Sequence, residues 1–147
     1  MEIIYFDVEY AIAIHDKIIE ISGGRSGINN SGLLSSVLDF IQDDMYYPTF
    51  EEKLTHLVYG INKNHAFSDG NKRSSIALGA YFMKINGYEY REKRFIYEME
   101  NIAVSVADNI ISKELLQKIV TSLLYEIDYS EGLKLEIFEA LSVNEVY

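Results

Sequence analysis

The apolar residues of this chain recur at helical spacing along almost its whole length, and this periodicity restricts the fold more than any other feature. Apolar side chains return every three or four residues, and no run alternates apolar and polar residues as a half-buried strand does. The single proline permits long helices, and an apolar content of 48% in 147 residues is enough to bury a core. The pattern predicts an all-α protein, a compact bundle of about six helices.

Capping residues and apolar stripes locate several of these helices. Asp7, Thr49 and Ser112 are suitable N-caps, and Thr49 with Glu52 forms a capping box. Helices are predicted at about residues 7–22, 32–41, 95–107 and 113–127, with another after Thr49.

The most apolar helix is expected to include residues 76–83, with Gly87 after its end. Its side chains are apolar nearly all round, so we expect it to be the central, buried helix of the bundle. Residues 2–6 form either a short strand, the only minor β element considered, or an extended entry. Residues 130–141 are predicted to form a last amphipathic helix. No segment rich in proline, glycine or serine divides the chain.

Charge and cysteine content exclude several classes of protein. The net charge is −10, whereas a general nucleic-acid binder needs a basic face to neutralise phosphates, so we expect no direct nucleic-acid binding. The chain has no cysteine, which excludes disulfides and suits a reducing compartment. The N-terminus is acidic, unlike that of a signal peptide, and no apolar run approaches the ~20 residues that span a bilayer. These features predict a soluble, cytoplasmic protein without a membrane partner.

The segment HAFSDGNKRSS, residues 65–75, departs from this pattern and is the candidate site. Gly70, Asn71, Lys72 and Arg73 are expected to form the first turn of the central helix, whose unpaired N–H groups and positive dipole end favour an anion. Glycine lets a ligand approach the backbone, and Asn71 can donate a further hydrogen bond. The two cations add charge suited to phosphate oxygens.

Three residues before that turn complete the candidate site. A carboxylate beside bound phosphates is a natural Mg²⁺ ligand, and Asp69 has that position. Histidine titrates near physiological pH, so His65 can take a proton from an incoming hydroxyl. Phe67 is expected to pin the loop to the core. Base, metal-binding carboxylate and phosphate cradle are together the parts of nucleotide-dependent transfer onto a hydroxyl.

The same segment resembles the signature of the Fic/Doc superfamily, His-x-Phe-x-(Asp/Glu)-(Gly/Ala)-Asn-(Gly/Lys)-Arg, at every defined position. The flanking segments ISGGRSGINNSGLL, YYPTFEEKLTHLVYGINKNHAF and FMKINGY resemble the death-on-curing (Doc) branch. The resemblance covers about residues 3–125 and implies a Fic/Doc-type helical domain over residues 1–127. Residues 128–147 would be a C-terminal extension packed on that domain as a helix. By the resemblance, His65 is the general base, Asp69 holds Mg²⁺, and residues 70–73 form the anion cradle.

Lys72 bears on which group is transferred. The AMP-transferring branch has a second glycine here, which leaves space for an α-phosphate, whereas a lysine fills part of that space and brings a cation for a terminal phosphate. The Doc branch, which carries the lysine, transfers the γ-phosphate of ATP to a threonine of translation elongation factor Tu. The resemblance therefore implies the toxin of a type II toxin–antitoxin pair, which uses ATP and Mg²⁺ to phosphorylate a protein hydroxyl and inhibit translation.

Two other functions stay open at this point. AMP transfer to a Ser, Thr or Tyr hydroxyl (AMPylation) would use the same His65 and Mg²⁺ site. A non-catalytic nucleotide- or protein-binding module would keep the fold without turnover, although the intact histidine and carboxylate argue against it. In this family a cognate antitoxin lays a segment across the toxin and masks its site.

Several residues outside the motif have competing interpretations. Ser122 and Glu126 have the spacing of an inhibitory helix found in some Fic proteins, but Ile127 stands where Gly or Asn is required, so we interpret the match as coincidence. The C-terminal segment is either a packed cap or a partner-binding helix.

Two histidines and one arginine are assigned structural or surface roles from their neighbours. His15 and His56 lie near apolar helix faces and are expected to pack, and Arg25 in the glycine loop is expected to be surface charge. Tyr46 and Tyr47 either contact a partner or pack onto the bundle.

Overall fold

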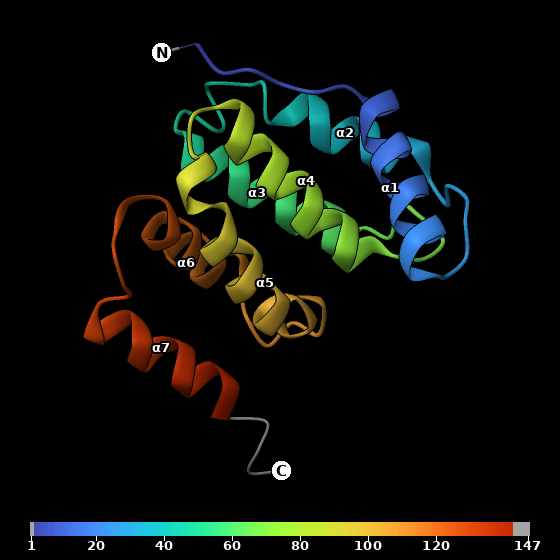
Figure 1. The fold of residues 1–147 in the computed structure, drawn as a ribbon. Coiled ribbons are helices and arrows are strands. Elements are labelled where there is room, and N and C mark those ends of the chain that lie inside the picture. The colour runs from blue at the N-terminus through green and yellow to red at the C-terminus, as the bar shows by residue number, and fades with distance from the viewer. Residues whose placement is uncertain (1, 143–147) are drawn as a thin grey trace.

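The computed structural model describes residues 2–142, and these contain helices and loops without a β-strand (Figure 1). The α-helices are α1 (Val8–Ser22), α2 (Ser31–Phe40), α3 (Phe50–Lys63), α4 (Asn71–Ile85), α5 (Glu92–Ala107), α6 (Lys113–Tyr125) and α7 (Glu131–Ser142). A short 3₁₀ turn, η1 (Glu89–Arg91), joins α4 to α5. The all-α prediction is confirmed, and α7 is the amphipathic helix expected near residues 130–141. Residues 143–147 of the expected extension lie outside the described part of the chain.

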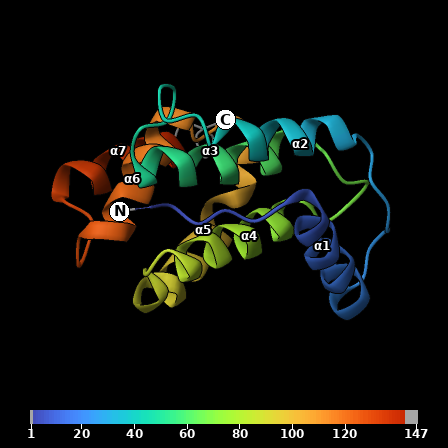
Figure 2. The ribbon, with the colours of Figure 1, turned by 90° about the horizontal axis from the view of Figure 1, so that it is seen from above.

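The helices form two layers that enclose the core (Figure 2). One layer contains α2, α3 and α6, the other contains α1, α4 and α5, and α3 packs closely against α4 at the centre. Leu78, Phe82 and Met83 of α4 have no exposed surface. The central position expected for the motif helix is therefore confirmed, and α3 shares it. None of the helices between residues 2 and 142 has the length and apolar character that a bilayer crossing requires.

Polar side chains begin most of these helices. Asp7, Thr49 and Ser112 each accept a hydrogen bond from the backbone N–H three residues further on, as their sequence positions predict. Asn30 caps α2 in the same way, so that helix begins one residue earlier than the apolar pattern indicates. Helix α5 also begins early, at Glu92, because η1 leads directly into it.

Residues 2–6 run extended along the edge of the bundle and form no strand. The Ile4 N–H donates to Oδ1 of Asn86 at 2.8 Å, and Nδ2 of Asn86 donates back to the Ile4 carbonyl at 2.9 Å. A side-chain amide thus takes the place that a neighbouring strand would have. The β element considered for this segment is absent, and the extended alternative is correct.

Helix α7 lies outside the two layers and contacts α6 (Figure 1). Leu133 is its one buried residue among those described. Lys118 of α6 pairs with Glu136 at 3.0 Å, and Arg94 of α5 pairs with Asp128 before α7 at 3.5 Å. The partly buried Ile137, Ala140 and Leu141 also pack against the core, so apolar contacts and exposed ion pairs together attach α7.

A compact cluster fastens the loop between α2 and α3. The Tyr47 ring stacks on His56 with 4.5 Å between centroids, so Tyr47 packs onto the bundle, whereas Tyr46 is 71% exposed. The Tyr47 hydroxyl and Nζ of Lys113 approach Nδ1 of His56 at 3.0 and 2.9 Å, so this nitrogen accepts and carries no proton. Burial and the Lys113 charge lower the pKa of His56 to about 4. The packing role expected for His56 is confirmed.

Gly79→Ala is expected to destabilise the fold by about 1–3 kcal/mol, because overpacking a core forces its neighbours apart. A Cβ at this position would lie 2.8 Å from Cγ2 of Val58 and 2.9 Å from Cζ of Phe95. Gly132→Ala is the matched control, since nothing lies within 4 Å of a Cβ there and alanine favours a helix by up to about 1 kcal/mol. Urea unfolding measures both variants, and equal free-energy changes would contradict the tight contact at Gly79.

His56 makes stability depend on pH between about 6.5 and about 4. Its pKa is lower in the folded state, so the unfolded chain binds the extra proton in this range and stability falls as pH decreases. His56→Gln removes this proton uptake. We therefore expect its destabilisation to be smaller at about pH 5 than at about pH 7, as measured by urea unfolding at both values. If the difference in unfolding free energy between wild type and His56→Gln is the same at both pH values, the imidazole of His56 is not held neutral and buried.

Candidate active site

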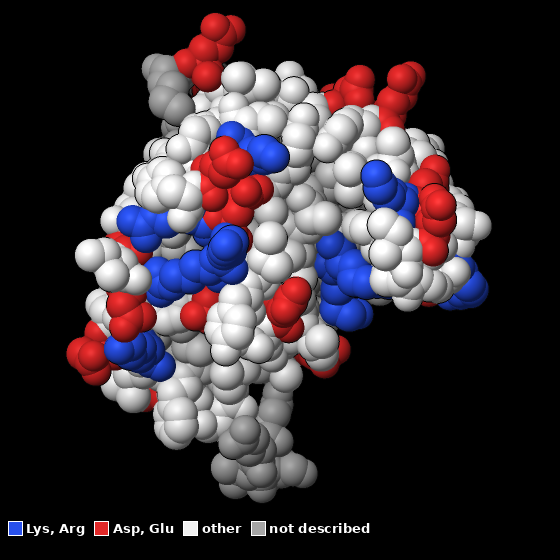
Figure 3. Space-filling view, in the orientation of Figure 1, with Lys and Arg blue, Asp and Glu red and all other residues white. Residues whose placement is uncertain are grey.

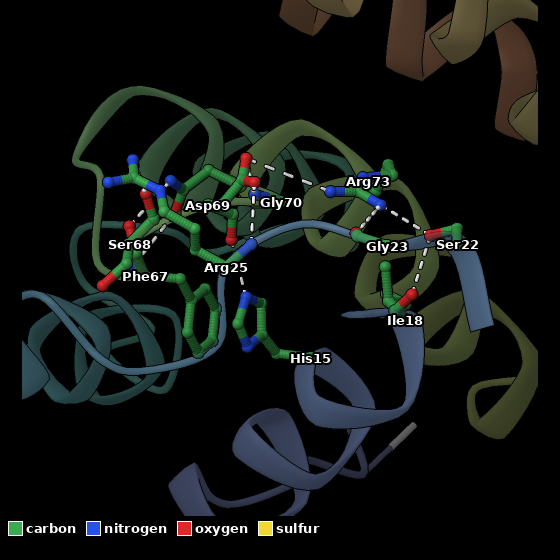
Figure 4. A network of polar contacts seen from close by, with 11 residues as sticks. His15, Ile18, Ser22, Gly23, Arg25, Phe67, Ser68, Asp69, Gly70 and Arg73 are labelled. Carbon is green, nitrogen blue, oxygen red and sulfur yellow. Dashed lines mark hydrogen bonds and ion pairs between the residues drawn. The ribbon is translucent and has the colours of Figure 1, made fainter. Parts of the chain in front are cut away.

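The candidate site lies at the N-terminal end of α4, where three segments that are distant in sequence meet (Figure 4). The loop 64–70 enters α4 there, beside the C-terminal end of α1 and the loop 23–30. Ile28 and Phe67 form an isolated antiparallel bridge between the two loops. Figure 3 shows Lys and Arg side chains grouped over the lower ends of α1 and α4, although the chain as a whole is acidic.

His65 stands at the start of the motif loop with its side chain exposed and its backbone fixed. Its φ of 50° is left-handed, which is uncommon for a side-chain-bearing residue. The His65 carbonyl accepts from Nδ2 of Asn29 at 3.3 Å, and the next carbonyl, of Ala66, accepts from the N–H groups of Asn29 and Asn30 at 2.8 and 2.9 Å. The imidazole is therefore presented to solvent from a rigid support.

Phe67 and Asn71 close the motif loop on itself. Phe67 is 1% exposed, as expected of the residue that pins the loop. Oδ1 of Asn71 accepts from the Phe67 N–H at 3.0 Å, and Nδ2 donates to the Phe67 carbonyl at 3.0 Å. The Asn71 side chain, expected to donate to an anion, is instead buried in the turn and bonded to the backbone. What Asn71 offers the cradle is its main-chain position in the first turn.

The N-terminus of α4 is left without a side-chain cap. Its N-cap, Gly70, has a φ of 75° and makes no capping hydrogen bond. The first bond across the helix start runs from the Ser74 N–H to the Gly70 carbonyl at 2.9 Å, so the N–H groups of residues 71–73 precede the helical ladder. A Cβ on Gly70 would lie 3.2 Å from Cδ1 of Ile19. Glycine at this position therefore allows the left-handed turn and leaves the helix N-terminus open. An open helix N-terminus favours an anion.

Asp69 is held by backbone amides on both oxygens. Oδ2 accepts from the Arg25 N–H at 3.0 Å, and Oδ1 accepts from the Gly70 N–H at 2.8 Å. These two bonds, that of Arg25 first, lower the pKa of Asp69 below its usual value, and the charges of Arg73 and Arg25 act in the same direction. The side chain is 42% exposed, so an ionised carboxylate is open to a ligand on one side.

The two cations of the first turn have different environments. Lys72 is exposed, as an unengaged phosphate ligand should be. Arg73 points back to α1, and its Nη1 donates to Oγ of Ser22 at 2.5 Å and to the Gly23 carbonyl at 2.8 Å. A cation at that position is favoured by the negative end of the α1 dipole. One nitrogen of the Arg73 guanidinium therefore secures α1, and the cradle role stays a prediction for the rest of the group.

Two residues that contact the site were not predicted from the sequence to belong to it. Arg25, expected to be surface charge, supplies its N–H to Asp69 and donates from Nη2 to the Ser68 carbonyl at 3.2 Å. His15 is packed, as expected, but its partner is the Asp69 carbonyl, 2.6 Å from Nε2. The glycine-rich loop and the polar residue on an apolar face were the available signals.

The Ser122–Glu126 match has no inhibitory geometry. The Glu126 carbonyl accepts from Arg91 and Arg94 at 2.5 and 3.1 Å, and Arg91 lies just beyond the C-terminal end of α4. Glu126 is thus at the opposite end of α4 from Arg73. The interpretation of this spacing as a coincidence is supported.

The fold and the site together define an all-α domain with a candidate phosphate-binding helix end beside an exposed histidine and an ionised carboxylate. The chain belongs to the Fic/DOC family, whose sequence model matches residues 5–83. It is 29% identical over 108 residues to "Protein kinase doc" of Escherichia phage P1, covering 71% of this chain and 82% of that protein. It is 30% identical over 89 residues to "Toxin Doc" of Mycolicibacterium smegmatis, covering 58% and 68%. The resemblance carried by the motif is confirmed.

Gly24→Ala is expected to move the loop 23–30 away from Asp69, because a Cβ there would lie 2.6 Å from Oδ2 of the carboxylate. Gly23→Ala is the matched control: both glycines have positive φ, 85° and 116°, but nothing lies within 4 Å of a Cβ at Gly23. We expect hydrogen exchange of the Arg25 N–H to become about tenfold faster in Gly24→Ala than in Gly23→Ala, the effect of one lost hydrogen bond. NMR measures it, and similar exchange in both variants would show that the close approach is not required.

Proposed function

We propose that this protein is a Doc-type toxin that transfers the γ-phosphate of ATP to a hydroxyl of a protein target. The observation that carries the proposal is Lys72, an exposed cation in the first turn of α4, a helix whose N-cap makes no side-chain hydrogen bond. The exposed His65 lies in the loop that leads into this turn. The names of the two relatives, a Doc kinase and a Doc toxin, support the same assignment.

In this proposal His65 is the general base. Its imidazole accepts the proton of the target hydroxyl while the hydroxyl oxygen forms a bond to the γ-phosphorus. The bond from that phosphorus to the oxygen bridging it to the β-phosphate breaks, and ADP leaves with the electron pair. Because His65 is exposed and its backbone is fixed, a side chain of another protein can reach it without rearrangement of the loop.

The residues present fit ATP with Mg²⁺. Asp69 offers a partly exposed, ionised carboxylate, and Mg²⁺ usually takes one or two carboxylates with phosphate oxygens and water. Residues 2–142 hold no cluster of three or more acidic, histidine or cysteine ligands, which suits an ion that arrives with the nucleotide. Bound Mg²⁺ neutralises charge on the phosphates.

The phosphate groups would be held by the chain itself at the start of α4. The N–H groups of residues 71–73 point out of the helix end, and Lys72 adds a flexible cation. Arg73 can contribute through Nη2, the nitrogen that lies 4.0 Å from Oδ1 of Asp69, while Nη1 stays on α1. The cradle thus combines fixed dipoles with one mobile and one anchored charge.

The target and the partner proposed here follow from the family. We propose translation elongation factor Tu as the target, with inhibition of translation as the outcome, and a cognate antitoxin that covers the site. The protein would act in the cytoplasm. The relative named as a toxin supports this context.

The second candidate function is AMP transfer to a protein hydroxyl, with His65 and Asp69 in the same roles. The N–H groups of residues 71–73, which precede the helical ladder of α4, could receive an α-phosphate as well as a γ-phosphate, and this observation keeps the candidate open. Lys72, where the AMP-transferring branch has glycine, favours phosphate transfer. Nucleotide binding without turnover is the third candidate.

The decisive experiment incubates the protein with Mg-ATP and purified elongation factor Tu and identifies the modification by mass spectrometry. We expect one phosphate on a target hydroxyl. His65→Ala is expected to slow transfer by about 10²–10⁴-fold, the usual contribution of a general base, with ATP affinity changed little.

The other outcomes separate the candidates. An AMP group on the target would show that the second candidate function, AMP transfer, is correct and that phosphate transfer is wrong. If other proteins are phosphorylated but elongation factor Tu is not, the proposed reaction holds and the proposed target is wrong. ATP binding without modification by either variant would favour the non-catalytic module.

A further inference from the structure

His15 is a fully buried polar side chain placed directly beneath the candidate site. It lies in α1, is 1% exposed, and stacks on Phe67 with ring centroids 3.8 Å apart and planes 3° from parallel. Nε2 lies 2.6 Å from the carbonyl oxygen of Asp69. One ring thus contacts two alternate residues of the motif loop from an element 54 positions earlier in the chain.

The protonation of Nε2 follows from its partner. A carbonyl oxygen can only accept a hydrogen bond, so Nε2 carries the proton and donates it. The other ring nitrogen, Nδ1, is 3.8 Å from a carboxylate oxygen of Asp16, beyond hydrogen-bond distance. The short bond from Nε2 is therefore the polar interaction that the buried ring makes with the loop.

This bond fixes the peptide unit that carries the Asp69 carboxylate into α4. The carbonyl of that unit accepts from His15, and its nitrogen, the Gly70 N–H, donates to the Asp69 side chain at 2.8 Å. The Arg25 N–H holds the other carboxylate oxygen at 3.0 Å. If the peptide unit turned, the Gly70 donor would turn with it and the carboxylate would lose its orientation.

Packing alone does not account for a histidine here. A phenylalanine would keep the stack on Phe67 but would leave the Asp69 carbonyl without its donor, and a buried carbonyl without a partner is unfavourable. We propose that His15 is a positioning residue that orients the Asp69 carboxylate for Mg-nucleotide binding. The binding part of this inference rests on the proposed function, whereas the orienting part concerns the protein alone.

Two variants separate the two contacts of the ring. His15→Phe keeps the aromatic stack and removes the donor, and His15→Gln keeps an N–H donor at the end of a chain of similar length and removes the stack. Hydrogen exchange of the Gly70 and Arg25 amides, the two donors to the carboxylate, is measured by NMR in the protein without ligand. We expect exchange about tenfold faster in His15→Phe and close to wild type in His15→Gln, with the amides of α6 unchanged in both.

The same variants are then compared for the Mg²⁺ dependence of ATP binding by calorimetry and of transfer to the target. In His15→Phe the Mg²⁺ concentration for half-saturation is expected to rise about 10–100-fold, as when a residue that orients a metal ligand is removed, with His15→Gln restoring most of the affinity.

The outcomes distinguish this inference from the proposed function. Unchanged exchange at Gly70 and Arg25 in His15→Phe, or equal loosening in both variants, would overturn the positioning role and leave His15 as a packing residue. If the amides loosen as expected but wild-type protein transfers neither phosphate nor AMP, the proposed reaction fails while the orienting role of His15 holds. Loosened amides with an unchanged Mg²⁺ dependence would separate Asp69 from metal binding and overturn that part of the inference.

Discussion

The uncapped N-terminus of α4 is the constraint on which the candidate site depends. Most helices of this protein satisfy a first-turn amide with a side chain, such as Asp7 or Thr49, whereas α4 begins at Gly70 with none. An unsatisfied helix end is unfavourable unless solvent or a ligand reaches it. The fold keeps it accessible by placing the rest of α4 in the core and its first turn at the rim, between α1 and the loop 23–30.

Neighbouring groups hold the turn in shape without covering its amides. Asn71 bonds to Phe67 on the inner side, Arg73 bonds to the end of α1, and the Arg25 N–H holds Asp69 from the facing loop. Several residues of the motif therefore stabilise the turn and also have a proposed chemical role. The sequence does not show which of these two roles a polar residue has, because a buried amide and a ligand-binding amide are the same residue type.

The sequence predicts the regular parts of this fold well. Apolar periodicity and N-caps such as Ser112 identify the helices, and the motif identifies the family and the candidate residues. The bonds between distant segments were not predictable. Asn86 pairs with Ile4 across 82 positions, and Arg25 reaches Asp69 through its backbone N–H, which every residue type except proline has. Such contacts leave no periodic signal, so Arg25 and the strand-like role of Asn86 emerge only from the fold.

Helix α7 and the candidate site are held by different sets of contacts. Helix α7 packs Leu133 and the partly buried Ile137 and Leu141 against the core, with exposed ion pairs such as Lys118–Glu136 beside them. The turn before α4 is held largely by hydrogen bonds to backbone groups. Dissolved ions screen exposed charge pairs but affect short, partly buried hydrogen bonds much less. Salt is consequently expected to weaken the ion pairs beside α7, whereas the hydrogen bonds of the turn that carries Asp69 are affected little.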